Sequence, residues 1–555
     1  MSLSAFKKLK KTAAYSGNIA DATIRDFSGG LKVSDNEIAL KNKYATVLKN
    51  LYPEEDTSQV LRFGTKAFAQ CSASIVNQIY FNDHIIAALV TGDIQVINDA
   101  GIVTTVWNET IANALSGNPS GWSVDIVSVD FTEFRGDLIV TNGIDKPLII
   151  SQDLTVDYLQ DIPTGNNVFV PIARYCATVN NYIVLAGVPG YEAEIFISAT
   201  GSSGTWPGDL PPNDSISFNV GAYAGQASSQ IQAISTFKNY LLVFFDNLTI
   251  VLELGIFNSE GIHIPEVIDT YTKVGTISNK TIVSTNNDII FPANAGVHTG
   301  QKTVFGGTLD IESITENLGV DYQATLGFVD AECFGCFAIH DIFSKTIFFI
   351  FHLNNGTVKS WGLRYKKTFK NPAWFEITGW NFTSACSSLK GRTFFGEGNM
   401  LYQYGNNVFS GEAYYSDYIP IDEEDGTNID FDWEFPWIDG GNRIKSKQLK
   451  KITFDTTGES AFLLQCFVNN FRTDQDGDDS PAVAMNFIAG NTTGYGGNFE
   501  GYGGDEYGGG RRANDERFYG LPLKFKIIKF RIKGSANKSL RFSSLSMIYA
   551  RGNYN

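Results

Sequence analysis

A short pattern of apolar and polar positions recurs along the middle of the chain. In each copy a moderately apolar stretch is followed by a polar turn of two or three residues and then by a strongly apolar stretch. Residues 240–245 (Tyr-Leu-Leu-Val-Phe-Phe) form one such apolar stretch and contain no polar side chain. A strand covered on both faces gives a continuous apolar run of this kind. The pattern therefore predicts β-hairpins whose second strands are buried.

The pattern repeats with a nearly constant period. Asn, Asp, Gly and Lys are frequent at its turns, and Asn and Gly tolerate the positive φ of tight hairpins. The turns are Asn82-Asp83, Arg135-Gly136, Asn180-Asn181, Lys238-Asn239, Asn286-Asn287, Ser344-Lys345 and Lys390-Gly391. The predicted strands that leave them are His84 to Leu89, Leu138 to Thr141, Tyr182 to Ala186, Tyr240 to Phe245, Ile289 to Phe291, Thr346 to Phe351 and Thr393 to Phe395.

A period near 50 residues is typical of one four-stranded propeller blade per repeat. We therefore expect an all-β chain with a central β-propeller. Seven turns favour seven blades, whereas closure of the last hairpin against Gln70 to Gln78 would leave six. The alternative is a set of unrelated β-sandwich hairpins.

Two regions lie outside the repeat. The sequence predicts an N-terminal segment at 1–62, a propeller at 63–407 and a C-terminal β-rich domain at 408–555, with the two terminal regions packed together as a second domain. Strand patterns in the last region cover Lys451 to Asp455, Ala461 to Val468, Leu523 to Lys533 and Leu540 to Tyr549. A Gly-rich stretch, Gly490 to Gly510, interrupts them, and we expect it to be a loop because it has little apolar area to bury.

Composition narrows the functional class. The 555 residues carry 43 Lys+Arg against 59 Asp+Glu, a net charge of −16, and aromatic residues make up 13%. No stretch reaches the ~20 consecutive apolar residues of a membrane helix. The lysines at 7, 8, 10 and 11 precede a polar stretch and no apolar signal-peptide core, so secretion by that route is not expected. The acidic charge also argues against a surface that coats DNA.

The six cysteines are too scattered for a disulfide framework, so reduced thiols are expected. Cys333-Phe334-Gly335-Cys336 has the spacing of a metal or redox motif. It precedes an apolar run that we interpret as a strand, and on a strand residues i and i+3 point to opposite faces. Buried, unpaired cysteines are therefore the prediction.

Catalytic and cofactor motifs are not recognisable in the chain. The Gly508 to Ala513 segment matches a dinucleotide-binding pattern without the preceding strand, and Asp474 to Asp479 lacks the Gly and Glu positions of a calcium loop. Ser198 to Trp206 is similar to the turn motif of sialidase blades, with Thr200 in place of the Asp, and that motif stabilises a fold. No catalytic, cofactor or metal site, and no enzyme activity, is predicted.

Several segments together resemble the tail nozzle, or tail tubular, proteins of short-tailed bacteriophages, which are also known as phage stabilisation or head-to-tail joining proteins. The resemblance spans nearly the whole chain. Its segments are Asp26 to Leu31, Asn42 to Ala45, Leu48 to Tyr52, Arg62 to Gly64, Ile195 to Trp206, Ile234 to Phe245, Val274 to Ser278, Asp288 to Phe291, Ala295 to Val297, Lys450 to Phe454 and Phe542 to Arg551.

The resemblance implies a virion structural protein without catalytic residues. It implies a homo-oligomeric six-fold ring below the portal and adaptor, a propeller in each subunit, tail fibre or tail tip proteins as further partners, and a central channel through which double-stranded DNA passes without sequence-specific binding. The protein would be made in the host cytoplasm and reside in the virion tail. An acidic ring suits that role because phosphates would not adhere to it.

Two segments are candidates for the channel wall or its tip. One is the acidic segment Asp422 to Glu434, which opens with Asp422, Glu423, Glu424 and Asp425; the other is the Gly-rich loop with Tyr495, Phe499, Tyr502 and Tyr507. Solvated surface on the outside of a ring is the alternative for both.

Two other functions remain open at this stage. One is a propeller-type carbohydrate-binding protein or glycosidase that acts on the bacterial surface, which would show convergent Arg or carboxylate residues at corresponding blade corners. The other is an interaction scaffold, which would show regular Gly-His and Trp-Asp signatures. Neither feature is found in the sequence.

Overall fold

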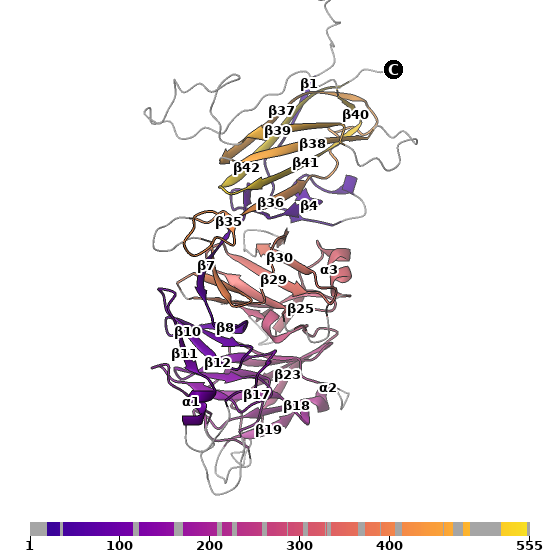
Figure 1. Ribbon diagram of the computed structural model, residues 1–555. Helices are drawn as coiled ribbons and strands as arrows, with labels where there is room; N and C mark the ends of the chain where they lie inside the picture. The colour runs from indigo at the N-terminus through magenta and orange to yellow at the C-terminus, as the bar shows by residue number, and fades with distance from the viewer. Residues whose placement is uncertain are drawn as a thin grey trace, which may run out of the picture. The chain divides into compact units, whose positions relative to one another are not determined.

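The computed structural model divides the chain into two compact units, residues 63–429 and residues 1–62 with 430–555 (Figure 1). The sequence-based division placed the second boundary at 407/408. The structure describes residues 19–551 except 34–36, 115–120, 160–169, 208–213, 225–229, 258–262, 286, 303–308, 328, 330–332, 334, 365–371, 389, 406–412, 459, 470–480 and 489–522.

The unit of residues 63–429 is a β-propeller. Its described residues form seven groups of four antiparallel strands, which are the blades. The first four blades are β8 (Ile75–Phe81), β9 (His84–Leu89), β10 (Ile94–Ile97) and β11 (Val103–Trp107); β12 (Asp130–Phe134), β13 (Asp137–Thr141), β14 (Leu148–Ile150) and β15 (Val156–Tyr158); β16 (Tyr175–Val179), β17 (Tyr182–Val188), β18 (Tyr191–Ile197) and β19 (Ile216–Asn219); and β20 (Ala233–Phe237), β21 (Tyr240–Phe244), β22 (Leu248–Glu253) and β23 (Glu266–Thr272).

The remaining blades follow the same order. They are β24 (Val283–Ser284), β25 (Asp288–Ala293), β26 (Gly296–Lys302) and β27 (Leu309–Ser313); β28 (Phe337–Asp341), β29 (Thr346–His352), β30 (Val358–Arg364) and β31 (Ala373–Ile377); and β32 (Ser384–Ser387), β33 (Thr393–Glu397) and β34 (Met400–Tyr404) with β7 (Thr65–Gln70). Short helices α1 (Glu109–Ala114), α2 (Gly221–Ala224), α3 (Gly319–Leu326) and the 3-10 helix η3 (Asn279–Thr281) lie between strands.

The second strand of each blade coincides with an apolar run predicted from the sequence. β9, β17, β21 and β29 are buried along almost their whole length. The turns before β9, β13 and β17 also have the expected backbone, since Asn82, Arg135 and Asn180 have φ of 46°, 53° and 48°. The predicted hairpins and their buried strands are confirmed.

The last blade is completed by a strand from the start of the propeller. β7 pairs antiparallel with β34, in a register that sets Gln70 opposite Met400 and Thr65 opposite Tyr404. Leu401 and Phe394 pack with Ile85 and Ala87 of the first blade in one apolar cluster. The ring therefore closes with seven blades, and β7 supplies the fourth strand of the seventh blade.

The second unit joins both terminal segments, as predicted. One sheet contains β40 (Lys524–Phe525), β37 (Lys447–Gly458), β42 (Leu540–Arg551), β6 (Gln59–Leu61), β5 (Leu51–Pro53) and β1 (Ile19–Ile24). A second layer contains β4 (Val47–Lys49), β36 (Thr427–Glu434), β41 (Ile527–Ala536), β38 (Ala461–Asn469) and β39 (Val483–Ile488). In Figure 1 the indigo β1 lies among the orange and yellow strands of the C-terminal segment.

Aromatic side chains fill the core between these two sheets. The ring of Phe542 on β42 lies 5.5 Å from Trp433 on β36 and 5.3 Å from Phe462 on β38, measured between ring centroids. Phe27 contacts Trp433 edge-on at 4.8 Å. Edge-to-face contacts of this kind stabilise a core beyond the area that they bury.

The prediction for the Cys333–Cys336 segment is wrong. The two cysteines form a disulfide, with their Cα atoms 5.2 Å apart. They lie before β28 in a turn in which the Cys336 amide donates to the Cys333 carbonyl at 3.1 Å. A turn folds the chain back on itself, so the two sulfurs converge where a strand would have separated them. Cys71, Cys176, Cys386 and Cys466 are free and buried.

Candidate functional site

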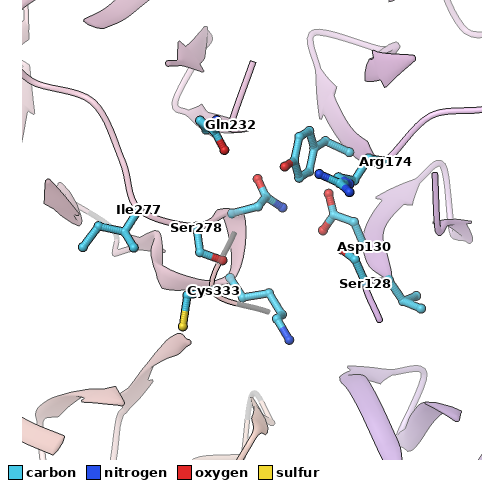
Figure 2. Close-up of a pocket in the computed structure, with 11 residues that line it drawn as sticks. Ser128, Asp130, Arg174, Gln232, Ile277, Ser278 and Cys333 are labelled. Atoms are coloured by element: carbon cyan, nitrogen blue, oxygen red, sulfur yellow. The ribbon is translucent and has the colours of Figure 1, made fainter. Parts of the chain in front are cut away.

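A cavity lies where the first strands of several blades meet. Figure 2 shows that the labelled side chains reach it from different directions. Its lining comes from the segments that lead into β12, β16, β20, β24 and β28, which places it on the propeller axis. The lining residues are Ser128, Val129, Asp130, Arg174, Tyr175, Gln232, Ile277, Ser278, Asn279, Lys280 and Cys333.

Asp130, Arg174 and Lys280 are the charged residues of this cavity. The Asp130 carboxylate accepts hydrogen bonds from the amides of Cys176, at 2.9 Å, and Phe131, at 3.0 Å. The Lys280 ammonium donates to the carbonyl of Val76 on β8 at 3.3 Å. These contacts connect the first, second, third and fifth blades at the axis.

Burial changes the acidity of Asp130 and Lys280. Burial raises the pKa of Asp130 to about 7, although the hydrogen bonds that Asp130 accepts and the charge of Lys280 lower this pKa. It lowers the pKa of Lys280 to about 8, against the attraction of Asp130. Desolvation disfavours the charged form of each group. Both side chains are partly exposed.

The size of the cavity limits what it can bind. Its volume available to the centres of water-sized molecules is about 20 Å³, which suits one or two waters. Lys280 also extends from η3 to the first blade. The axis of a single propeller is therefore closed to a nucleic-acid strand at this level, and the cluster fastens blades to one another.

The Ser198 to Trp206 turn has the fold-stabilising role expected of it. Trp206 is fully buried and donates from Nε1 to the Ser203 carbonyl at 3.0 Å. The Ala199 amide donates to the Thr205 carbonyl at 2.9 Å. Thr200, which replaces the motif's aspartate, donates through its amide and its hydroxyl to the Asp214 carboxylate. Asp214 therefore supplies the missing carboxylate from the other side of the turn.

The predicted acidic candidates fall into two groups. Asp422, Glu423, Glu424 and Asp425 are all exposed, between β35 (Ser416–Asp417) and β36. Further along the segment, Asp432 and Glu434 are less exposed and form ion pairs, with Arg531 at 2.6 Å and Lys529 at 2.9 Å respectively. The segment therefore opens with four exposed acids and ends with acids that are paired to cations.

The aromatic candidates Tyr495, Phe499, Tyr502 and Tyr507 lie outside the described residues, as does the whole of Gly490 to Gly510. The axial residues Asp130, Arg174 and Lys280 were not among the predicted site residues. They come from separate repeats, and no spacing in the sequence connects them.

The two units differ in charge. Residues 63–429 contain 16 Lys+Arg and 37 Asp+Glu, a net charge of −21. The other unit contains 27 Lys+Arg and 22 Asp+Glu, a net charge of +5. The negative charge of the chain therefore belongs to the propeller, and its field repels phosphates at short range.

No group of three or more His, Cys, Asp or Glu side chains with metal-binding geometry occurs within the described part of the chain. Over the same residues, no helix is long and apolar enough to cross a membrane.

His298 on β26 gives a testable pH effect. Its ring is buried, neither ring nitrogen has a hydrogen-bond partner among the described residues, and it stacks on Phe291 at 6.0 Å. Burial lowers the pKa of His298 below its usual 6.5.

As pH falls, His298 therefore takes up a proton in the unfolded chain before it does so in the folded chain. We expect this histidine to reduce the free energy of unfolding as pH falls below 6.5, by up to about 1.4 kcal/mol per pH unit. Urea denaturation of His298→Leu and of the unmodified chain at a series of pH values tests this. The variant should lose less stability on acidification, and parallel pH profiles would contradict the assignment.

Comparisons with known proteins give likeness in fold only. No protein-family model and no curated protein matches the chain. Among solved structures it is similar to U3-55K (11% identity, TM-score 0.39, 61% of this chain and 98% of that one) and to the WD40 propeller domain of Doa1 (10%, 0.33, 62% and 98%). It is also similar to PorZ, a surface component of the type-IX secretion system of Porphyromonas gingivalis (9%, 0.37, 71% and 44%). The propeller assignment rests on the strand pairing described above.

Proposed function

We propose that this chain is a structural subunit of a phage tail nozzle, in which several copies form a ring around a DNA channel below the portal and adaptor. The observation that carries the proposal is the charge of the propeller unit, −21 over 367 residues. A wall around moving DNA must not retain phosphates, because each cation contact adds affinity. The sequence resemblance supplies the family context.

The axial cavity restricts where the proposed DNA channel can lie. Because Lys280 extends from η3 to Val76 of the first blade and the axial cavity has room for only one or two waters, we infer that DNA does not pass through one subunit there. The channel must instead be enclosed by several subunits. A propeller suits such a wall because its strand edges are short and protected. The ring then retains the genome and delivers it during infection, and its role requires no catalytic group.

An imaging experiment tests the oligomer. The purified chain is examined by electron cryo-microscopy alone and after mixing with the adaptor and portal proteins of the same virus. We expect a six-fold ring in the mixture, even if the chain alone is monomeric, because head-to-tail contacts close into rings. A monomer in both samples, or a two-fold or five-fold assembly, would contradict the proposal.

An activity assay tests the absence of catalysis. We expect no turnover of host polysaccharide or peptidoglycan by the purified chain. Hydrolysis that a single carboxylate substitution abolishes would instead establish the glycosidase alternative.

A further inference from the structure

Four exposed apolar side chains gather on one face of the propeller. Val124, Val127, Ile144 and Ile172, here called the apolar patch, have exposed fractions of 68%, 50%, 51% and 37%. Val124 and Val127 lie between the last strand of the first blade and β12, Ile144 in the turn between β13 and β14, and Ile172 just before β16. In blades of consecutive antiparallel strands, these two kinds of connection open on the same face.

Hydrogen bonds between these loops hold the patch together. The Asp145 carboxylate accepts from the amide and the hydroxyl of Ser123, both at 2.8 Å. The Gly143 amide donates to the Ala173 carbonyl at 2.9 Å, beside Ile172. The Asp125 amide donates to the Val90 carbonyl at 2.7 Å. A surface fixed in this way loses little conformational entropy when a partner docks on it.

The border of the patch carries more acidic than basic residues. Asp125 separates Val124 from Val127 and is exposed, and Glu109 on α1 is exposed nearby in the same connection. Lys146 is the exposed cation beside Ile144. An apolar centre with such a border fits a partner that presents an apolar side chain between cations.

The other unit of the same chain presents such a group. Ile444 is 83% exposed, and its neighbours Arg443 and Lys445 are also exposed. The loop is fixed, because the amides of Ile444 and Lys445 both donate to Asn442 Oδ1 at 3.0 Å and the Gly441 amide donates to Asp439 Oδ1 at 2.8 Å. This unit has net positive charge, opposite to the propeller.

We propose that the Arg443–Lys445 loop of one copy docks on the apolar patch of a second copy. This inference rests on the proposed function, since two different surfaces that meet between identical subunits give the head-to-tail contact from which a ring closes. Ile444 would cover Val124 and Val127, and Lys445 would face Asp125. The contact buries an apolar side chain that otherwise stays in water.

A cross-linking experiment tests the contact in assembled rings. The Val124→Cys/Ile444→Cys chain is assembled with adaptor and portal proteins and treated with a short bis-maleimide. We expect a denaturing-gel ladder of covalent multimers up to the hexamer, because each copy links to the next. The single variants Val124→Cys and Ile444→Cys are controls that cannot form a ladder. The free native cysteines are buried and should not react.

A second variant tests the same contact without cross-linking. Ile444→Asp should reduce the yield of rings at least tenfold, whereas the matched Ile444→Val should assemble normally. Thermal unfolding of both should match that of the unmodified chain, because the side chain is exposed. Normal assembly of Ile444→Asp would overturn the inference.

The two proposals fail in different ways. A six-fold ring whose cross-linked products are only monomers, or contain the adaptor in place of a second copy, overturns the docking inference and leaves the nozzle function standing. Absence of any ring from the unmodified chain overturns the function itself.

Discussion

Replacing Lys280 by methionine is expected to lower the free energy of unfolding by about 3 kcal/mol at pH 7, where Lys280 carries its charge, as for other buried charges that lose their counter-charge. Methionine keeps most of the apolar stem but removes one of the two cations, Lys280 and Arg174, that line the cavity with the Asp130 carboxylate. The Val76 carbonyl also loses its donor. Chemical denaturation, followed by intrinsic fluorescence, measures the loss.

The matched control removes both charges. Lys280→Met/Asp130→Asn should lie within about 1–2 kcal/mol of the unmodified chain, because neither Lys280 nor Asp130 is then left without the other, and Arg174, the third charged residue in the lining, is unchanged. Asp130 accepts hydrogen bonds from two amides, and an asparagine has only one acceptor oxygen for them. This difference accounts for the remaining loss of stability in the double variant. A double variant at least as unstable as Lys280→Met would show that the two charges are independent.

The same pair gives the unmodified chain a distinctive pH dependence. The folded-state pKa of Asp130, about 7, lies above its ordinary value of 3.8, so the folded chain holds this proton more tightly. The contribution of Asp130 to stability therefore falls as pH rises from about 4 to 7. The folded-state pKa of Lys280, about 8, lies below 10.5, so its contribution rises as pH increases from about 8 to 10.5.

We therefore expect the pair to contribute least between about pH 7 and 8. The difference in unfolding free energy between the unmodified chain and Lys280→Met/Asp130→Asn isolates this effect from that of the histidines. A difference that stays constant from about pH 5 to 10 would contradict the assignment.

Leu401→Ala is expected to lower the free energy of unfolding by about 3 kcal/mol, the usual size of a leucine-to-alanine change in a tight core. Leu401 on β34 is fully buried opposite Ala69 of β7, in the cluster that joins the seventh blade to the first. Urea denaturation measures the loss. Hydrogen exchange in Thr65–Gln70 should accelerate more than in β21, because the space left by the shorter side chain lies where β7 closes the ring.

Leu401→Met is the matched control, since it keeps most of the volume and should lose less than about 1.5 kcal/mol. Equal stability of Leu401→Ala and the unmodified chain would mean that this cluster does not support the closure.

The sequence predicts the parts of the fold that depend on local burial and turn chemistry. The second strands are covered on both faces, so their residues had to be apolar without interruption, and β9 matches its predicted range at both ends. The outer and inner strands carry weaker patterns. β24 has only two residues, and β12 begins at the charged Asp130 because its start faces the axial cavity.

The axial cluster could not be predicted in the same way. Asp130 and Lys280 are separated by 150 positions and become neighbours only when the ring closes. Whether Cys333 and Cys336 can form a disulfide depends on whether the backbone between them is a turn or a strand. The neighbouring apolar run favoured a strand, which is wrong. Geometry that comes from closure or from a single turn leaves no periodic signal in a sequence.

The pairing of β7 with β34 has a consequence for synthesis on the ribosome. Gln70 pairs with Met400, which is synthesised 330 residues later, so β7 lacks its partner strand during that interval. At about 5–20 residues per second, that interval lasts roughly 15–70 s. β1 waits longer still, because it pairs with Leu545 to Ala550. The propeller therefore cannot close before Tyr404 has been made, and the other unit cannot be completed until translation is nearly over. Early blades must remain soluble with an open edge until then, a state in which chaperones would have the most time to act.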